Sequence, residues 1–353
     1  METNTSRKPL LEVKNLSIGI HRPAKERKTQ DRTVSQLLSS VEDISFNIYP
    51  GEILGIVGES GSGKSLTALS IAGLLGRNKE ITGGSIFLYG NEPELAGIDL
   101  PSLDEENFCH VRGKDISIIF QEPFSSLNPL MKIGAQIEET LELHGEKDRA
   151  KNKKSVIELM EKLKLPEPKK LINTYPHRLS GGMCQRVMIA LAVICRPRLL
   201  IADEPTTALD NSTQDQIITL LREINRDFGT SILFISHDLS LIKKLCHRVI
   251  VMYSGRFLEE GDTDDVFNSP AHEYTSCLID SIPKRTNRGK PLNVISGRIP
   301  SLEEGRPQGC PFHPRCAKAI SQCKTDFPPA RVIKASGQSS AAVHRTHCVL
   351  GAL

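Results

Sequence analysis

The sequence predicts an α/β fold built on a mostly parallel central sheet. Short apolar runs, of the kind expected for strands buried on both faces, alternate with helical stretches along much of the chain. Parallel neighbours need long crossover connections, so this alternation predicts right-handed strand–helix–strand units. A glycine-rich loop between the first buried run and a helix, and a later run that ends in two acids, point to the same architecture.

The elements follow from periodicity and from turn residues. Strands are predicted at 10–20, 41–48, 52–57, 85–89, 116–120, 199–202, 231–235, 249–252 and 256–259. Helices are predicted at 66–75, 186–195 and 213–226, with a further helical region over about 130–180. The polar, basic stretch 21–40 is predicted to be a surface loop, and the pattern loosens into Pro, Gly, Ser and Arg after Pro283.

Composition places the chain among ordinary globular proteins. Its 353 residues are 25% charged and 39% hydrophobic with a formal net charge of +3, which excludes collagen-like, disordered and disulfide-scaffold classes. At about 150 residues per domain, two domains are expected. The longest near-apolar run, 187–195, falls short of the roughly 20 residues that span a bilayer. We expect no transmembrane helix and no secretory signal, hence a cytosolic protein or one held at a membrane by a partner.

Charge is unevenly divided. From residue 281 onward twelve Lys and Arg residues accompany three acids, so the preceding part of the chain is net acidic. A basic segment of this kind could meet nucleic acid or anionic lipid, could offset buried negative charge, or could be a solvated surface.

The segment Gly58-Glu59-Ser60-Gly61-Ser62-Gly63-Lys64-Ser65 fits the pattern G-x-x-x-x-G-K-[ST] between a buried strand and a helix. Glycines allow successive backbone N–H groups to point inward, and with the helix N-terminus they cradle phosphate. Lys64 adds a positive charge near the β and γ oxygens, and the Ser65 hydroxyl is placed to hold Mg²⁺. The motif predicts binding of a nucleoside triphosphate.

Polar side chains follow three of the buried strands. Asp203 and Glu204 end the strand at 199–202, where we expect Asp203 to hold Mg²⁺ and Glu204 to act as general base on water. His237 follows the strand at 231–235 and can hydrogen-bond a γ-phosphate. Gln121 follows the strand at 116–120, and its amide can reach Mg²⁺ or the attacking water. Each would be an ordinary strand end if it stood alone.

The stretch Leu179-Ser180-Gly181-Gly182-Met183 completes a pattern that resembles the nucleotide-binding subunits of ABC transporters. Six motifs stand in the family's order: the phosphate loop, Gln121, the signature at Ser180, Gly181 and Gly182, the acids Asp203-Glu204, the segment 207–210 that ends at Asp210, and His237. The resemblance covers about 10–280. It implies a P-loop ATPase with a mainly parallel core sheet, an antiparallel β subdomain and a helical insertion at about 122–180, followed by an extension at 281–353.

The resemblance also implies how the motifs work together. Ser180 and two glycines open a helix, which makes a second anion site. In the family this site binds the γ-phosphate held by another subunit's phosphate loop, so that two subunits enclose two ATP molecules and Asp210 acts across their interface. The implied partners are a second ATPase subunit, favoured to be a sister chain, two permease subunits and a substrate-binding protein. The implied location is the cytoplasmic face of the inner membrane.

Longer strings resemble the oligopeptide/dipeptide importer branch, among them 121–129, 175–178 and 309–316. The implied function is ATP-driven uptake of di- or oligopeptides, with Mg²⁺ as cofactor and no nucleic acid as partner. Another cargo such as nickel and a non-transport ABC ATPase acting on nucleic acid are the alternatives; the signature counts against a small-molecule kinase. The family usually stacks adenine on an aromatic side chain after the first strand, and the matching place here is near Ile20, with His21 beside it. Either the stacking contact is missing or His21 substitutes for the aromatic residue.

Four cysteines crowd the end of the chain: Cys310, Cys316, Cys323 and Cys348. Without an export signal, reduced thiols are expected rather than disulfides. Four thiolates can complete a tetrahedral metal or an iron–sulfur cluster, and the wide spacing without a C-x₂-C pair suits a zinc ribbon poorly. In the resembling family such tails are associated with a [4Fe–4S] cluster; zinc and unligated thiols are the other interpretations.

Overall fold

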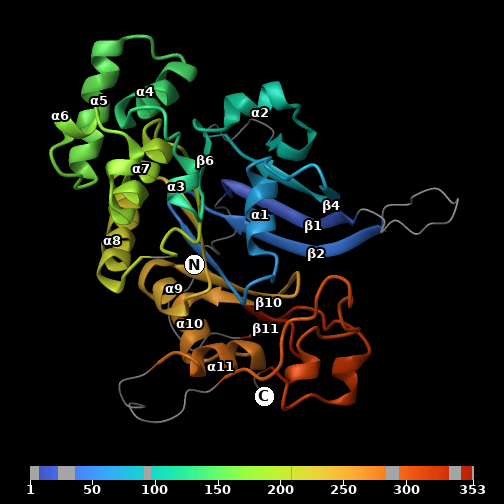
Figure 1. Cartoon of the computed structure of the whole chain (residues 1–353). Coiled ribbons are helices and arrows are strands. Elements are labelled where there is room, and N and C mark those ends of the chain that lie inside the picture. The colour runs from blue at the N-terminus through green and yellow to red at the C-terminus, as the bar shows by residue number, and fades with distance from the viewer. Residues whose placement is uncertain are drawn as a thin grey trace, which may run out of the picture. The chain divides into compact units, whose positions relative to one another are not determined.

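Figure 1 shows the computed structural model of the chain, which describes residues 8–22, 36–90, 97–207, 209–283, 294–333 and 343–351. The described residues form two compact units. Unit 1 takes the described parts of Met1–Ile48, Leu54–Pro101 and Ser236–Leu353, and unit 2 takes those of Tyr49–Ile53 and Ser102–Ile235. Each unit is described by itself.

An antiparallel sheet of unit 1 has the order β2-β1-β4-β5 (Figure 1). Its strands are β1 (Leu11–Arg22), β2 (Gln36–Ile48), β4 (Lys79–Leu88) and β5 (Ile98–Asp99). The expected loop over 21–40 was wrong at both ends, because His21 and Arg22 pair with Leu37 and Gln36 in a longer hairpin. Leu37 and Leu38 stand next to each other in this part of the ladder, and Leu37 is 44% exposed, so no apolar alternation marks the strand in the sequence. Residues 23–35 of that expected loop lie outside the described residues.

A second set of strands in unit 1 has the order β11-β12-β10-β9-β3. These are β3 (Ile53–Val57), β9 (Arg248–Tyr253), β10 (Arg256–Asp262), β11 (Arg331–Ile333) and β12 (His344–Thr346). β3 pairs with β9 in parallel, and the remaining pairs are antiparallel. The predicted hairpin around Ser254-Gly255 is confirmed as β9–β10. Residues far beyond Pro283 join this set, where the sequence pattern showed no strand.

The helices of unit 1 are short. They are α1 (Lys64–Ile71), α9 (Leu239–Leu245), α10 (Thr263–Asn268) and α11 (Glu273–Asp280), with 3₁₀ turns at Leu100–Ser102, His313–Arg315 and Ser321–Lys324. Tyr253, Tyr274 and Phe312 form one aromatic cluster, with ring centroids 4.7 to 5.4 Å apart. All three side chains are fully buried. This cluster packs the C-terminal extension against β9 and α11.

Unit 2 contains three parallel strands in the order β8-β7-β6: β6 (Ile116–Ile119), β7 (Leu199–Asp203) and β8 (Ser231–Ser236). Their registers are parallel throughout, which confirms the predicted parallel pairing. Every residue of β7 and β8 is buried. The carboxyl ends of these strands therefore meet at one edge, and polar residues beyond them are brought together there.

Helices make up most of the rest of unit 2 (Figure 1). They are α2 (Glu105–Val111), α3 (Pro123–Ser126), α4 (Ile133–Leu143), α5 (Arg149–Lys162), α6 (Pro168–Leu171), α7 (Gly181–Val193) and α8 (Asn211–Phe228), with a 3₁₀ turn at Pro176–Arg178. α7 begins earlier than the predicted residue 186 because Ser180 caps it. Among the described residues, we find no helix with the length and apolar character needed to cross a bilayer.

Candidate active site

The phosphate loop of unit 1 follows the buried strand β3 and opens α1, as the sequence predicts. Its turns need glycine at specific points: Gly61 and Gly63 have φ of 80° and 103°, values that side chains other than hydrogen strongly disfavour. A Cβ on Gly58 would lie 2.0 Å from the Met252 carbonyl oxygen. The loop therefore sits directly against β9, and this close packing holds its backbone in place.

Lys64 is held inside its own loop. The side chain is almost fully buried, and its Nζ donates to the carbonyl oxygens of Gly58 at 2.8 Å and Glu59 at 3.0 Å. Ser62 is buried, whereas Ser65 is exposed at the start of α1. The ammonium group thus lies in the loop's concavity, where it can exchange backbone carbonyls for phosphate oxygens.

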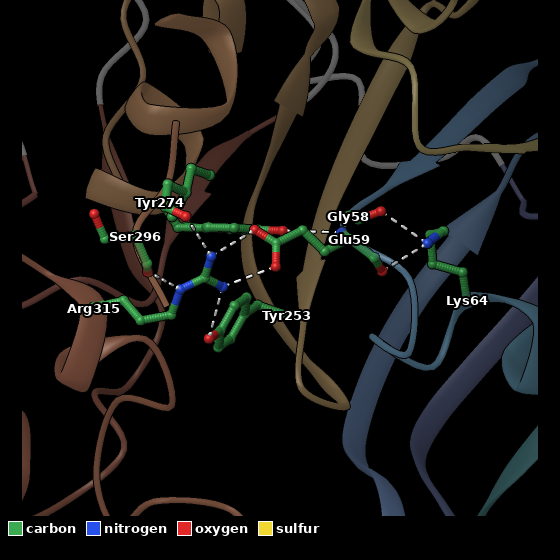
Figure 2. Close-up of polar contacts among 8 residues, drawn as sticks. Gly58, Glu59, Lys64, Tyr253, Tyr274, Ser296 and Arg315 are labelled. Atoms are coloured by element: carbon green, nitrogen blue, oxygen red, sulfur yellow. Dashed lines mark hydrogen bonds and ion pairs between the residues drawn. The ribbon is translucent and has the colours of Figure 1, made fainter. Parts of the chain in front are cut away.

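Glu59 anchors the loop to the C-terminal part of unit 1 (Figure 2). Its backbone N–H donates to the Tyr274 hydroxyl at 3.0 Å. Its carboxylate accepts two hydrogen bonds from the guanidinium of Arg315, at 2.8 and 3.2 Å. Sequence reasoning placed Glu59 in the loop but missed Arg315 and Tyr274, because nothing local connects residues so far apart in the chain.

His237 also belongs to unit 1. It is exposed and stands directly after β8, and the next residue, Asp238, caps α9 by accepting from the Ser240 N–H at 2.7 Å. The side chain therefore stands just before the capped start of α9.

The two predicted acids lie in unit 2 at the end of β7. Asp203 is 8% exposed and is the last residue of the strand. Glu204 has φ 47°, a left-handed conformation that is uncommon for a residue with a side chain, and its N–H donates to the Ile235 carbonyl at 3.0 Å. Strain of this kind concentrates at functional positions, because the surroundings must over-determine it.

Gln121 and Glu204 meet because they follow β6 and β7, which are neighbouring parallel strands. Gln121 Nε2 donates to Glu204 Oε2 at 3.3 Å, and the Thr207 hydroxyl donates to the same oxygen at 3.1 Å. Thr207 was noted in the sequence only as part of a motif. Two donors thus orient the carboxylate through one of its oxygens.

The signature residues open α7. The Ser180 hydroxyl accepts from the Met183 N–H at 3.4 Å and caps the helix. A Cβ on Gly182 would come within 2.9 Å of Thr213 in α8, whereas Gly181 has only Leu209 nearby, at 3.9 Å. Gly182 therefore serves helix packing, and Gly181 leaves open space over the helix N-terminus.

Asp210 is exposed at the start of α8. It accepts from the N–H and the hydroxyl of Thr213, at 3.0 and 2.7 Å. These hydrogen bonds lower the pKa of the Asp210 carboxyl. The side chain is therefore ionised at neutral pH. Its neighbour Ala208, part of the same motif, lies outside the described residues.

The four terminal cysteines belong to unit 1. Cys310 and Cys323 are buried and Cys316 and Cys348 are partly buried, and the backbone N–H of Cys310 donates to the Cys323 carbonyl at 2.9 Å. Burial raises the pKa of the Cys310 thiol to about 12, with neighbouring cysteines adding to the rise. Within the described part of the chain, no group of three or more His, Cys, Asp or Glu side chains is arranged to hold a metal ion. The four thiols are therefore suitable donors for an iron–sulfur cluster, but in the described part of the chain they are not arranged to bind one.

His272 lies beside Cys310. Its Nδ1 accepts from the Tyr274 N–H at 3.0 Å, so the ring proton of the neutral imidazole sits on Nε2, 3.7 Å from the Cys310 sulfur. Complete burial lowers the pKa of His272 to about 3, with a further contribution from His347. The ring is therefore neutral.

At the position expected for adenine stacking, His21 Nε2 lies 3.2 Å from a carboxylate oxygen of Glu80. Ile20 pairs with Leu38 across β1 and β2. The place is occupied by strand residues, and the imidazole of His21 is the ring that stands there.

Two family models match the chain. One described as "ABC transporter" matches residues 41–207, and one described as "Oligopeptide/dipeptide transporter, C-terminal region" matches residues 258–323. The first spans the phosphate loop, Gln121, the signature and both acids. The second spans Tyr274 and Phe312 of the aromatic cluster, Arg315 and three of the four terminal cysteines.

Curated relatives match over almost the whole length. An oligopeptide transport ATP-binding protein, OppD, of Haemophilus influenzae is 45% identical over 316 residues, which are 90% of this chain and 92% of that protein. OppD of Escherichia coli is 42% identical, covering 92% of this chain and 91% of that protein. The oligopeptide transport ATP-binding protein AppD of Bacillus subtilis is 43% identical, covering 90% and 92%.

Solved structures agree in fold. A dimeric structure of the ATP-binding cassette MJ0796 in a post-hydrolysis state with ADP and Pi aligns with a TM-score of 0.58 at 27% identity, covering 72% of this chain and 98% of that one. CbiO1 of Clostridium perfringens aligns with a TM-score of 0.58 at 25% identity, covering 74% and 91%. The fold is that of an ABC ATPase, an enzyme class that binds ATP with Mg²⁺ and hydrolyses it. By its motifs, fold and full-length relatives, the chain belongs to the ATP-binding proteins of ABC transporters, in their oligopeptide/dipeptide branch.

Proposed function

We propose that this chain is the ATP-binding subunit of an importer that couples ATP hydrolysis to uptake of di- or oligopeptides through a membrane permease. The observation that carries the proposal is the match over about nine tenths of the chain to proteins named for oligopeptide transport. This match includes the C-terminal region that is characteristic of that branch.

The phosphate loop supplies the binding half of the chemistry. The loop N–H groups and Lys64 would hold the β- and γ-phosphates of ATP, with Lys64 giving up the carbonyls of Gly58 and Glu59 as phosphate enters. Mg²⁺ would neutralise phosphate charge during transfer. Oxygen donors suit that ion, and the exposed Ser65 hydroxyl, the Asp203 carboxylate and the Gln121 amide would hold it.

Glu204 supplies the catalytic half. Its carboxylate, oriented by Gln121 and Thr207, would take the proton of the attacking water as general base. His237 would hydrogen-bond the γ-phosphate. Turnover in this scheme depends on positioning and on charge stabilisation, as in other phosphoryl transfers.

A second ATPase subunit would complete each site. Ser180, Gly181 and Gly182 of this chain would bind the γ-phosphate held by the partner's loop, and Asp210 would act across the same interface. Support comes from the open helix N-terminus at Gly181 and the ionised, exposed Asp210. Family resemblance favours a sister chain as that partner.

The membrane partners would dock on the helical region at about 122–180. Phe124 and Leu130 are 53% and 85% exposed there, so apolar side chains are available next to Gln121. We place the chain at the cytoplasmic face of the inner membrane, held by two permease subunits and served by a substrate-binding protein.

The finer proposal of a [4Fe–4S] cluster on Cys310, Cys316, Cys323 and Cys348 rests on the donor set, four thiols on one extension. Since these side chains form no ready ligand group in the described structure, they would have to move to bind it. The test is iron, sulfide and zinc analysis of anaerobically purified protein. About four irons per chain would support the cluster, and zinc would support a single metal ion. If neither metal is found, the four cysteines are free thiols.

Transport is tested by isolating the native membrane complex, reconstituting it in vesicles and measuring ATP-dependent uptake of labelled di- and oligopeptides. The matched control is the same complex with Glu204→Gln in this chain. Peptide accumulation that needs ATP and is lost with Glu204→Gln supports the proposal. Uptake of Ni²⁺ without peptide uptake, or ATPase activity that responds to nucleic acid and not to peptide, contradicts it.

A further inference from the structure

Arg315 joins the C-terminal extension to the phosphate loop. Its Nη1 lies 2.8 Å from Glu59 Oε2 and its Nη2 lies 3.2 Å from Glu59 Oε1, so the pair is bidentate (Figure 2). Both residues belong to unit 1. A two-pronged guanidinium–carboxylate contact is both stronger and more directional than a single bond between charged groups.

Arg315 is built into its surroundings. Its side chain is 7% exposed, and it also donates to the Tyr253 hydroxyl at 3.3 Å and to the carbonyls of Ile295 and Ser296 at 3.2 and 2.7 Å. Burial alone would lower the pKa of this guanidinium, but the hydrogen bonds to Glu59 and Tyr253 outweigh it and the pKa is raised. A cation so placed cannot swing away to solvent.

Glu59 is held at three points. Arg315 holds its carboxylate, the Tyr274 hydroxyl accepts from its N–H, and its carbonyl oxygen accepts from Lys64. The residue that fixes the loop's first turn therefore shares a hydrogen bond with the lysine that would bind phosphate. Any shift of Glu59 therefore changes the position of the Lys64 ammonium group.

We propose that Arg315 is a positioning residue for ATP binding, which neutralises the Glu59 carboxylate and holds the phosphate loop open to the triphosphate. This inference rests on the proposed ATPase role of the loop and deepens it. A segment far from the nucleotide motifs thereby sets the affinity for ATP.

The charge of Glu59 predicts that removal of Arg315 weakens ATP binding. When Arg315 is removed, the half-buried carboxylate of Glu59 loses its charge partner. This carboxylate lies on the loop that would receive the phosphates of ATP. Like charges repel most strongly where water is scarce, and a carboxylate with no partner in a partly buried site is costly. The loss of Arg315 therefore weakens ATP binding rather than the chemical step.

The experiment measures MgATP hydrolysis by the full transport complex. Arg315→Met keeps an apolar chain against Tyr253 and Phe312 but removes the charge. We expect the KM for MgATP to rise about tenfold with kcat within about twofold, since hydrogen bonds between charged groups are among the stronger ones in proteins. Adding Glu59→Gln removes the carboxylate left behind, and we expect it to bring KM back to within about threefold of the unmodified complex.

Two further variants distinguish a role of Arg315 in positioning the phosphate loop from a role in holding the C-terminal extension in place. Lys318→Met removes an exposed ion pair with Glu273 in the same extension and should leave KM unchanged. Arg315→Lys keeps the charge and should raise KM by less than Arg315→Met does. If Arg315→Met fails to fold, the Lys variant and the Glu59→Gln, Arg315→Met double variant decide the matter.

An unchanged KM in Arg315→Met would overturn the inference, and so would an equally raised KM in the double variant, because a purely structural attachment cannot be rescued by losing a carboxylate. Failure of the proposed function looks different. In that case the unmodified complex itself would show no ATP hydrolysis linked to peptide.

Discussion

Glu204 combines an unusual backbone with a supported carboxylate. Its left-handed φ of 47° turns the chain sharply after β7, and Gln121 and Thr207 hold one carboxylate oxygen. A residue without a functional demand would relax to an ordinary conformation, because left-handed backbone costs about 1–3 kcal/mol where a side chain is present. The structure thus keeps this carboxylate in place before any nucleotide arrives.

Glu204→Gln should retain ATP binding and lower turnover by about 100-fold or more. Glutamine has the same shape and can accept the same hydrogen bonds, but it cannot take a proton from water. Single-turnover hydrolysis and equilibrium ATP binding measure the two parts. Glu158→Gln, on the exposed side of α5, is the matched control. An unchanged rate in Glu204→Gln would remove Glu204 from the role of base.

His272 should make the fold sensitive to acid. Burial lowers its pKa to about 3 in the folded chain, whereas an unfolded histidine titrates near 6.5. Below pH 6.5 the unfolded chain takes up a proton that the folded chain refuses, so stability falls as pH falls toward 3. Between pH 7 and pH 5 this amounts to about 2 kcal/mol.

The measurement is urea unfolding at several pH values for the wild-type chain and for His272→Gln. The variant should lose stability at pH 7, because the cap on α11 and the contact near Cys310 change, but it should depend less steeply on pH. An equal slope in the two proteins would show that the buried imidazole takes no part in the acid response.

At the scale of elements, the two glycines that open α7 have separable roles. Gly181→Leu places its side chain in open space and should keep the wild-type melting temperature, while turnover of the complex falls at least about tenfold because the anion site is covered. Gly182→Leu forces α7 against Thr213 and should lower stability by about 1–3 kcal/mol. Calorimetry and steady-state ATPase assays separate the two. Full activity in Gly181→Leu would argue against a second anion site.

Elements with strong periodicity were predicted well, and those held by long-range contacts were not. α8 has an apolar face and was predicted at 213–226, within two residues of its bounds Asn211–Phe228. β11 and β12 were missed, because Arg331–Ile333 and His344–Thr346 become strands only by pairing with each other and with β10. A three-residue strand has no period that a sequence can display.

At the scale of the whole molecule, the same division applies to the candidate site. Each motif residue was predicted because its chemistry is local: a loop, a strand end or a helix cap. The contact between Glu59 and Arg315 joins residues 256 apart in sequence, and no spacing rule connects them. Burial favours that partnership, since a guanidinium inside unit 1 needs a carboxylate and Glu59 is within hydrogen-bond reach.

Glu259 in β10 contacts β12, the last strand of the described chain, inside unit 1. Its carboxylate, 1% exposed, accepts from the N–H groups of Ala271 and His272 and lies 2.7 Å from His344 Nε2. β12 also covers the edge of β10. Proteolytic cleavage just before residue 343 would remove β12. The backbone N–H and C=O groups at the edge of β10 would then be unpaired, and Glu259 would lose its contact with His344. Molecules cleaved in this way should aggregate, so the final eleven residues protect the solubility of the chain as well as its fold.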